Sequence, residues 1–230
     1  MRAWEDLPEY MQVDEVRPYW EVLYKKRGQL VIKRVFDLIV AIVMLLVLLI
    51  PMLIIGIWIK IDSAGPVFYR QERVTQHGKH FRIHKFRTMV SNADKIGTSV
   101  TVGNDSRITR VGSKLRKLRL DELPQVIDVI EGTMSFVGTR PEAVKYVERY
   151  QNEWNATLLL PAGITSECSI RYKDEDKLLD AADDADKVYV ERVLPEKMKW
   201  NLKSITEFSF RADIRTMFRT VAAVLGKEYK

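Results

Sequence analysis

Two acidic residues, Asp121 and Glu122, stand side by side directly after a stretch rich in cations. The cations of that stretch are Arg107, Arg110, Lys114, Arg116, Lys117 and Arg119. An ionised carboxylate can attack phosphorus as a nucleophile, and two carboxylates together can hold a divalent cation that shields phosphate charge. The pair therefore indicates phosphoryl-transfer chemistry. The structural alternative is that Asp121 simply caps the helix expected to follow it, because acidic N-caps are common.

The stretch 107–119 has the pattern of an amphipathic helix. Its apolar residues, Ile108, Val111, Leu115 and Leu118, are spaced three, four and three apart, as one face of a helix requires. The basic face is either a solvated surface or a wall that binds phosphate, and the adjoining carboxylates favour the wall. A nucleic-acid backbone would also suit such a face. The net charge of only +6 and the lack of a known DNA- or RNA-binding motif argue against that function.

Two further cations are expected at the end of a strand. The segments 67–69 and 81–87 are rich in strand-forming residues, and Gly78 between them supports a hairpin. Alternate residues of 81–87 share one face, which ends in Lys85 and Arg87. Arg140 follows a tight turn and is fixed by Pro141, so its planar guanidinium suits a phosphate. Lys85, Arg87 and Arg140 are therefore candidates for binding phosphate.

The three histidines, His77, His80 and His84, are spaced three and four apart. On a helix they would suggest zinc, but the hairpin places His77 in the turn. No nearby cysteine or carboxylate completes a metal site in the sequence. We expect packed or solvated imidazoles.

An uncharged apolar segment occupies residues 38–59. As a helix it would be roughly 33 Å long, enough to cross a bilayer core. Basic residues flank it on both sides, and positive charge marks the cytoplasmic side of a membrane. Pro51 lies inside the run and should bend the helix. The charges alone leave a true span and a hairpin that returns to the same face equally open.

Composition excludes several other classes of protein. The aromatic residues are numerous enough to build a core, so the chain is not disordered. The single Cys168 cannot form an internal disulfide, and the common phosphate-loop, dinucleotide, zinc-protease and serine-hydrolase motifs are absent. A membrane-anchored scaffold without catalysis stays an alternative, against which the intact acidic pair argues.

Several motifs occur in an order that resembles one known family. They are Lys33-Arg34 before the apolar helix, Gly65-Pro66-Val67-Phe68-Tyr69-Arg70-Gln71-Glu72-Arg73, Lys85-Phe86-Arg87-Thr88-Met89, Leu120-Asp121-Glu122-Leu123-Pro124-Gln125, Met134-Ser135-Phe136-Val137-Gly138 and Arg140-Pro141. In these the chain resembles a bacterial sugar transferase of the monotopic phosphoglycosyl transferase type. The likeness departs at Ile50, where the family often has serine, at Thr133, where it usually has aspartate, and at Thr139, where it has proline.

The resemblance implies a function and roles for residues. The family transfers a sugar phosphate from a UDP-sugar to a polyprenol phosphate (undecaprenyl phosphate), which begins the synthesis of exopolysaccharide, capsule, O-antigen or glycoprotein glycan. It implies Asp121 as the nucleophile that carries the phosphosugar, Glu122 as its assistant, and Mg²⁺ at both. It further implies that Lys85, Arg116 and Arg140 lie near the phosphates, and we expect them, with Arg87, around the carboxylate pair. It also implies a re-entrant helix broken at Pro51, with the catalytic domain on the cytoplasmic face of the bacterial inner membrane.

The expected fold is α/β and mostly helical. It consists of an N-terminal extension (1–32), a re-entrant membrane helix hairpin (33–61) and a small cytosolic catalytic domain with a β-hairpin and amphipathic interfacial helices (62–230). One such helix is expected at 197–225, lying either on the core or on anionic headgroups. The acidic stretch 174–186 is expected to be a solvated helix face rather than a calcium site. Membrane lipid is an expected partner, nucleic acid is not, and a homodimer stays open.

Overall fold

A computed structural model of the chain describes residues 1–93, 105–172 and 184–227. This part of the protein is mostly helical and carries small sheets, as expected. The helices are α1 (Arg17–Lys25), α2 (Arg27–Asp62), α3 (Arg110–Lys117), α4 (Gln125–Glu131), α5 (Val144–Val147), α6 (Glu167–Arg171), α8 (Ala185–Val188), α9 (Leu194–Thr206) and α10 (Phe210–Val224). The strands are β1 (Phe68–Tyr69), β2 (Glu72–Val74), β3 (His80–Arg82), β4 (Lys85–Phe86), β5 (Met134–Val137) and β6 (Ala162–Thr165). Tighter turns of helix that matter below are η3 (Gln76–Gly78), η5 (Leu120–Glu122), η6 (Asn152–Leu159) and η7 (Tyr189–Val193).

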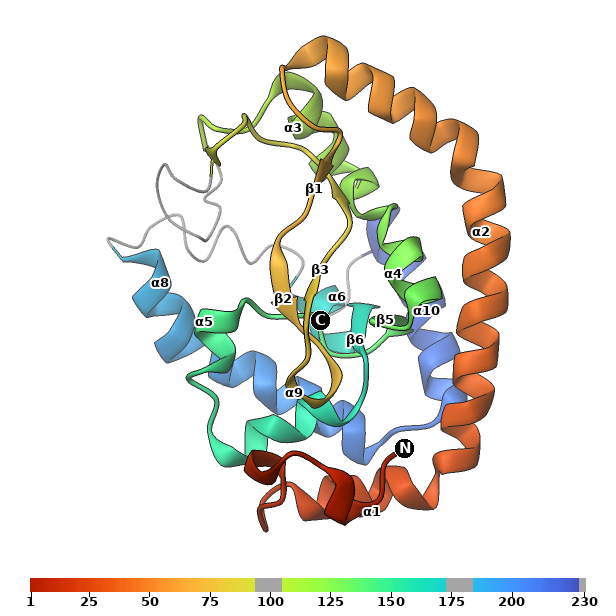
Figure 1. Ribbon diagram of the computed structural model, residues 1–230, viewed down its shortest axis with the longest axis vertical. Coiled ribbons are helices and arrows are strands. Elements are labelled where there is room, and N and C mark those ends of the chain that lie inside the picture. The colour runs from red at the N-terminus through yellow and green to blue at the C-terminus, as the bar shows by residue number, and fades with distance from the viewer. Residues whose placement is uncertain (94–104, 173–183, 228–230) are drawn as a thin grey trace.

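Helix α2 is one continuous element that includes Pro51. It follows one edge of the body and curves over the upper end toward α3 (Figure 1). Within the described ranges it is the one helix whose length and apolar composition would suffice to cross a membrane. Its outer face is bare, with Leu46 72% and Ile50 68% exposed, whereas Ala41 and Ile59 are buried against the body. The helix therefore packs on the protein near both ends and presents an apolar surface between them.

The strands form three two-stranded sheets in the described chain. β1 pairs with β4 and β2 with β3, both antiparallel, while β5 and β6 are parallel. η3 makes the turn between β2 and β3, so the hairpin expected at Gly78 is confirmed. The single strand expected over 81–87 is wrong: β3 and β4 are separate and have different partners. Ile83 N–H bonds to the Gln71 carbonyl between them, and the chain shifts there from one ladder to the other.

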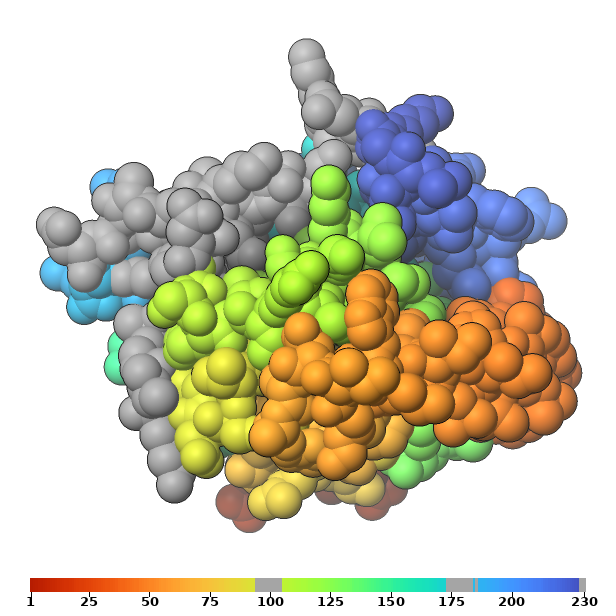
Figure 2. All heavy atoms as spheres, turned by 90° about the horizontal axis from the view of Figure 1, so that it is seen from above, coloured from red at the N-terminus to blue at the C-terminus, as the bar shows by residue number. Residues whose placement is uncertain are grey.

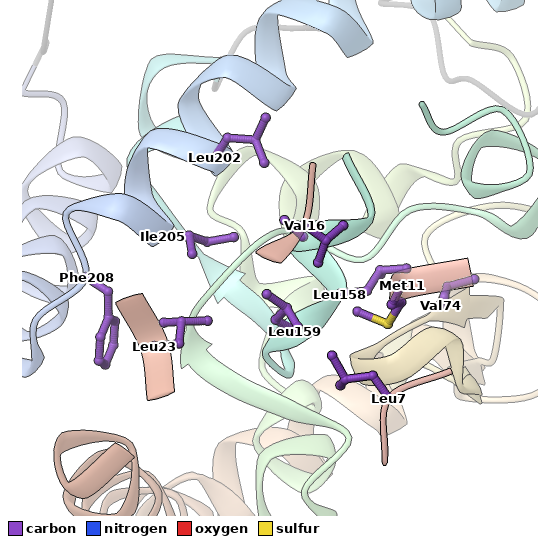
Figure 3. Packing of buried hydrophobic residues seen from close by; sticks show 11 residues of the cluster. Leu7, Met11, Val16, Leu23, Val74, Leu158, Leu159, Leu202, Ile205 and Phe208 are labelled. Carbon is purple, nitrogen blue, oxygen red and sulfur yellow. The ribbon is translucent and has the colours of Figure 1, made fainter. Parts of the chain in front are cut away.

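The N-terminal residues belong to the core of the body. Met11, Val16 and Leu23 are fully buried and pack with Leu159 of η6 and with α9 (Figure 3). Burying such side chains contributes roughly 1.5–3 kcal/mol each. Residues 1–32 therefore help to hold η6 and α9 in place, and they are not a free extension.

The C-terminal region contains two helices where the pattern indicated one. α9 ends at Thr206, and Ser209 begins α10 by accepting a hydrogen bond from the Ala212 N–H. Phe208 between them is buried in the core, which fixes the corner. Most of the acidic stretch 174–186 lies outside the described residues. Asp186, which is inside, bonds to Lys145 and Tyr146.

A buried group of charges ties α2 to α10. The ammonium of Lys33 lies 2.7 Å from Asp213 and 3.8 Å from Asp37. Asp37 also accepts a hydrogen bond of 2.6 Å from Ser135 of β5. Because a buried charge that loses its partner is costly, these contacts fix the first half of α2 on the body.

Candidate active site

The acidic pair lies in η5, at a corner between α3 and α4. Arg119 adopts a left-handed backbone conformation that ends α3 and turns the chain into η5. The expectation that Asp121 caps the next helix is wrong, because α4 begins at Gln125 with Pro124 before it and no side-chain cap. The Asp121 side chain is consequently not used to satisfy the backbone of that helix.

Glu122 is the meeting point of three distant segments. Its Oε1 accepts hydrogen bonds from Lys85 Nζ at 3.1 Å and from Arg140 Nη2 at 2.5 Å. Lys85 stands on β4, and Arg140 stands in the loop after β5. The structure therefore brings together two of the cations that the sequence predicted, on one carboxylate.

Asp121 differs from its neighbour in its partners. Its Oδ1 is buried and has no hydrogen-bond partner among the described residues. Burial raises the pKa of Asp121 above its ordinary 3.8, Lys85 opposes that rise, and the charge of Glu122 adds to it. For Glu122 burial also disfavours ionisation, but Arg140 and Lys85 outweigh it and hold the pKa well below 4.5. Lys85 and Arg140 thus neutralise the charge of Glu122, whereas Asp121 Oδ1 is left available to a ligand that enters the site.

Arg116 and Arg119 act on the same carboxylate from the end of α3. Both charges lower the pKa of Asp121, more weakly than Lys85 does. Helix α3 is confirmed, and Thr109 caps its start by accepting from the Gly112 N–H. Of the basic residues in the last turn of α3, Arg116 therefore acts on the acidic pair.

Arg87 makes a different contact. Its guanidinium donates to the carbonyls of Ser63 and Ala64 at 2.7 and 2.9 Å. These bonds hold the chain just after the end of α2. The structure gives no contact between Arg87 and the acidic pair, so its role in phosphate binding stays a prediction.

A backbone contact positions the loop that carries Arg140. Gly138, just after β5, and Gly163 in β6 lie so close that a Cβ on Gly163 would overlap the Gly138 backbone, and a Cβ on Gly138 would lie 2.8 Å from the Pro161 carbonyl oxygen. Gly163 also donates a hydrogen bond of 2.8 Å to the Thr139 carbonyl. Only residues without a side chain allow this approach, which sets the direction of Arg140 toward Glu122.

The sequence patterns missed a buried network beside the site. Glu142 accepts from Tyr189 at 2.7 Å and from Lys197 at 3.0 Å, and Lys197 also donates to the Tyr189 hydroxyl at 2.7 Å. Arg73 adds its charge to Glu142 and donates to the Pro141 carbonyl at 3.3 Å. The available signal was a lysine, Lys197, among the mostly apolar residues of the buried face of α9. The network anchors the segment 140–142 to the C-terminal helices.

A cavity of about 1440 Å³ lies beside the acidic pair. Its walls include the acidic pair, Lys85, Arg116, Arg119 and Arg140, together with polar residues of β6, α6 and α9. A cavity of this size takes a ligand much larger than a free phosphate. Its cationic lining favours an anionic one.

None of the three histidines lines this cavity. His77 lies in the hairpin turn, and burial, with nearby cations, lowers its pKa to about 4. His80 pairs with Glu72 at the surface. The expectation that no carboxylate lies near His84 is wrong, because Asp128 and Glu131 of α4 are close to it. Both Asp128 oxygens already bond to His84, to its backbone N–H at 2.9 Å and to Nδ1 at 2.7 Å, so the contact ties β4 to α4.

The residues at the acidic pair fit a magnesium ion. Mg²⁺ prefers carboxylate oxygens, and Asp121 offers a buried oxygen without a hydrogen-bond partner in the described chain. Glu122 lies beside it, although Lys85 and Arg140 already neutralise its charge. Asp121 would therefore be the main protein ligand, and Glu122 the accessory one.

Comparison with known proteins gives a consistent result. The sequence model of a family described as bacterial sugar transferase matches residues 28–227. A UDP-N-acetylgalactosamine-undecaprenyl-phosphate N-acetylgalactosaminephosphotransferase of Aeromonas hydrophila is 32% identical over 84% of this chain and 44% of its own length. A UDP-glucose:undecaprenyl-phosphate glucose-1-phosphate transferase of Escherichia coli is 35% identical over 83% of this chain and 39% of its own. The chain thus spans less than half of these two relatives. A putative undecaprenyl-phosphate N-acetylgalactosaminyl 1-phosphate transferase of Bacillus subtilis is 41% identical over 56% of this chain and 72% of its own.

Proposed function

Because the chain belongs to the bacterial sugar transferase family, we propose that it transfers a sugar 1-phosphate from a UDP-sugar to a polyprenol phosphate such as undecaprenyl phosphate. The reaction releases UMP and leaves a polyprenyl-diphosphate sugar, the first lipid-linked unit of a bacterial glycan. The named activities of the relatives support this reaction class. The observation that carries it is the Asp121 carboxylate, whose Oδ1 is buried with no hydrogen-bond partner among the described residues, beside a neutralised Glu122.

In the first step Asp121 attacks the β-phosphorus of the UDP-sugar. A bond forms between the carboxylate oxygen and phosphorus, the bond from phosphorus to the bridging oxygen breaks, and UMP leaves with that oxygen. The raised pKa of Asp121 reflects a poorly solvated carboxylate, which makes it a better nucleophile once ionised. Lys85, Arg116 and Arg140 stabilise the negative charge that gathers on the phosphate oxygens.

In the second step an oxygen of the polyprenol phosphate attacks the phosphorus held on Asp121. The acyl phosphate bond breaks and restores the carboxylate, so the protein ends unchanged. Glu122 keeps Lys85 and Arg140 in place through both steps. A bound Mg²⁺ ion would neutralise negative charge on the diphosphate.

The exposed apolar face of α2 supports a membrane location for this chemistry. The helix enters the cytoplasmic face of the inner membrane, bends at Pro51 and returns to the same face, which is the re-entrant arrangement. Basic flanks on both sides support that orientation. Exposed apolar residues of α10 and just after it, Phe218 at 73% and Leu225 at 82%, add a second membrane contact. A soluble nucleotide sugar and a lipid phosphate can then meet at headgroup depth.

One experiment tests both the activity and its two steps. The full chain in lipid nanodiscs receives a panel of UDP-sugars with Mg²⁺, with and without undecaprenyl phosphate, and UMP is measured. We expect one UDP-sugar to give continuous UMP release with lipid. Without lipid it should give a stoichiometric burst and a protein labelled by the sugar phosphate. UMP only in the presence of lipid would overturn the covalent route, and no UMP from any donor would favour a non-catalytic scaffold.

A further inference from the structure

The lining of the cavity at the acidic pair is of two chemical kinds. Part of it is polar and cationic, and Arg73, Lys85 and Arg140 are among these residues. The apolar part, called the apolar end below, is built around Met44, Val126, Phe136 and Ile164, which pack in one hydrophobic cluster. Residues lining the apolar end are Met44 of α2, Leu123 just before α4, Val126 of α4, Phe136 of β5, Ile164 of β6 and Val224 of α10.

The apolar end lies next to the exposed apolar surfaces of the molecule. Met44 belongs to the helix whose outer face carries Leu46 and Ile50. Val224 is 52% exposed and stands near the end of α10, where Val221 and Leu225 are also exposed. Seen from above, the lime-green segment that carries α3 lies between the orange α2 and the blue α10 (Figure 2). The cavity wall therefore includes residues of both helices whose exposed apolar surfaces the proposed function assigns to the membrane.

Helix α10 contacts the protein through polar and apolar residues. Asp213 pairs with Lys33, Thr220 bonds to Thr165 of β6 at 2.7 Å, and Met217 packs against the hydrophobic cluster. Toward the C-terminal end of the helix, Val221 and Val224 are exposed. These exposed apolar residues, with the contribution of Ala223 and Val224 to the cavity wall, fit a helix that guides an apolar chain into the site.

We propose that the apolar end of this cavity is the binding site for the first isoprene units of the lipid acceptor. This proposal rests on the proposed function. The anionic head of the acceptor lies among the cations at Asp121, and its hydrocarbon leaves between α4 and α10 toward α2. An amphiphile with one anionic end and one branched apolar chain matches a site that is cationic at one end and apolar at the other. The nucleotide sugar enters, and UMP leaves, at the polar end.

A matched pair of substitutions on α10 tests this assignment. Val224→Asp places a charge at the cavity wall, whereas Val221→Asp places the same charge one helical turn away. Val221 does not line the cavity, and it is 59% exposed. Both substitutions remove a valine from the same outer surface of α10, so a general loss of membrane contact affects both. Both positions are more than half exposed, and both variants should fold.

Ala223→Phe, which narrows the cavity, and Ala222→Phe beside it form a second pair.

The readout is the KM for undecaprenyl phosphate and, separately, the KM for the UDP-sugar, in nanodiscs of fixed lipid composition. We expect Val224→Asp to raise the acceptor KM about tenfold above that of Val221→Asp, which corresponds to roughly 1.4 kcal/mol. The donor KM should be the same in both variants. Equal acceptor KM values in the two variants would overturn the inference and leave the proposed function intact. A wild-type protein that releases no UMP would instead contradict the proposed function.

Discussion

Asp121 and Glu122 are neighbours in the chain, but their carboxylates have opposite surroundings. Glu122 receives Arg140 at 2.5 Å and Lys85 at 3.1 Å, whereas Asp121 Oδ1 is buried with no hydrogen-bond partner in the described structure. A carboxylate kept without hydrogen bonds in a buried place costs stability. Such a loss of stability is expected at a residue that serves a reaction rather than the folding of the protein.

Replacing Asp121 should separate stability from activity. A carboxyl group whose pKa is raised on folding binds more protons in the folded state, so stability falls as pH rises from 3.8 through the folded pKa. At neutral pH that cost is fully present, and Asp121→Asn removes it. We expect the variant to unfold at a higher temperature, with a gain of about 1 kcal/mol, and to lose more than about a hundredfold in UMP release. Asp14→Asn, at an exposed position, is the control and should change neither. A less stable Asp121→Asn protein would contradict this interpretation of the site.

The pH profile of the first step should be bell-shaped. On the acid side activity falls as Asp121 takes up a proton, and because its pKa is raised the midpoint should lie above 3.8. On the alkaline side burial lowers the pKa of Lys85 below 10.5, with Glu122 opposing that effect. Loss of the ammonium charge then removes one partner of Glu122. Stopped-flow measurement of the UMP burst against pH checks both limbs, and an acid midpoint at or below 3.8 would contradict the first.

Removing Arg140 should affect both folding and catalysis. Arg140→Ala leaves Glu122 with Lys85 alone, and a buried carboxylate that loses a charged partner costs about 1–3 kcal/mol. UMP release should fall as well, because a cation near the phosphates is lost. Arg140→Lys keeps the charge but not the planar donor pair, so it should recover stability better than activity. Urea unfolding and UMP assays on the two variants measure the difference. Equal recovery of both properties would show that Arg140 acts only as a charge.

The network at Glu142 should be a strong determinant of stability. Lys197→Met removes a buried cation from a buried carboxylate, a change that typically costs about 3–5 kcal/mol. Glu142→Gln combined with Lys197→Met should be more stable than Lys197→Met alone, because the stranded charge is gone. Tyr189→Phe should cost about 1 kcal/mol. Urea unfolding of the wild type, Glu142→Gln, Lys197→Met and the double variant gives the coupling, and additive losses would mean that Glu142 and Lys197 act independently.

The N-terminal segment should be needed for folding of the body. Leu23→Ala removes a fully buried side chain that packs with Leu159 and Phe208, and such a change usually costs about 2–5 kcal/mol. Val31→Ala, at an exposed position of α2, serves as the control and should change stability little. Thermal unfolding in detergent checks both variants. An unchanged transition in Leu23→Ala would show that the segment is dispensable.

Local patterns predicted much of this fold. The spacing of Val111 and Leu115 indicated α3, the turn residues around Gly78 indicated a hairpin, and the apolar run indicated α2. Each of these depends on neighbours within a few residues, where periodicity and turn chemistry carry the information. The predicted partners Lys85 and Arg140 also meet at Glu122, because the motifs that hold them end at one corner of the body.

The errors arose where tertiary contacts overrule local pattern. Asp121 has an ideal type for an N-cap, but the left-handed turn at Arg119 places it before the helix begins. The C-terminal periodicity runs through the corner at Phe208, which only its burial in the core explains. Glu142 and Lys197 are far apart in the chain, and no spacing rule connects them. A buried lysine and a buried glutamate are each improbable alone, and only the folded arrangement pairs them.

The ion pair of Lys33 and Asp213 limits how the bilayer can act on this protein. A shift of α2 along its axis by one turn is about 5.4 Å, which is too far for the ammonium, now 2.7 Å from its carboxylate, to keep that contact. The two helices must therefore rise or sink together when lipid thickness changes. In the proposed membrane-bound arrangement the carboxylate of Asp121 moves with them. The protein, and not the thickness of the bilayer, then sets its depth below the headgroups.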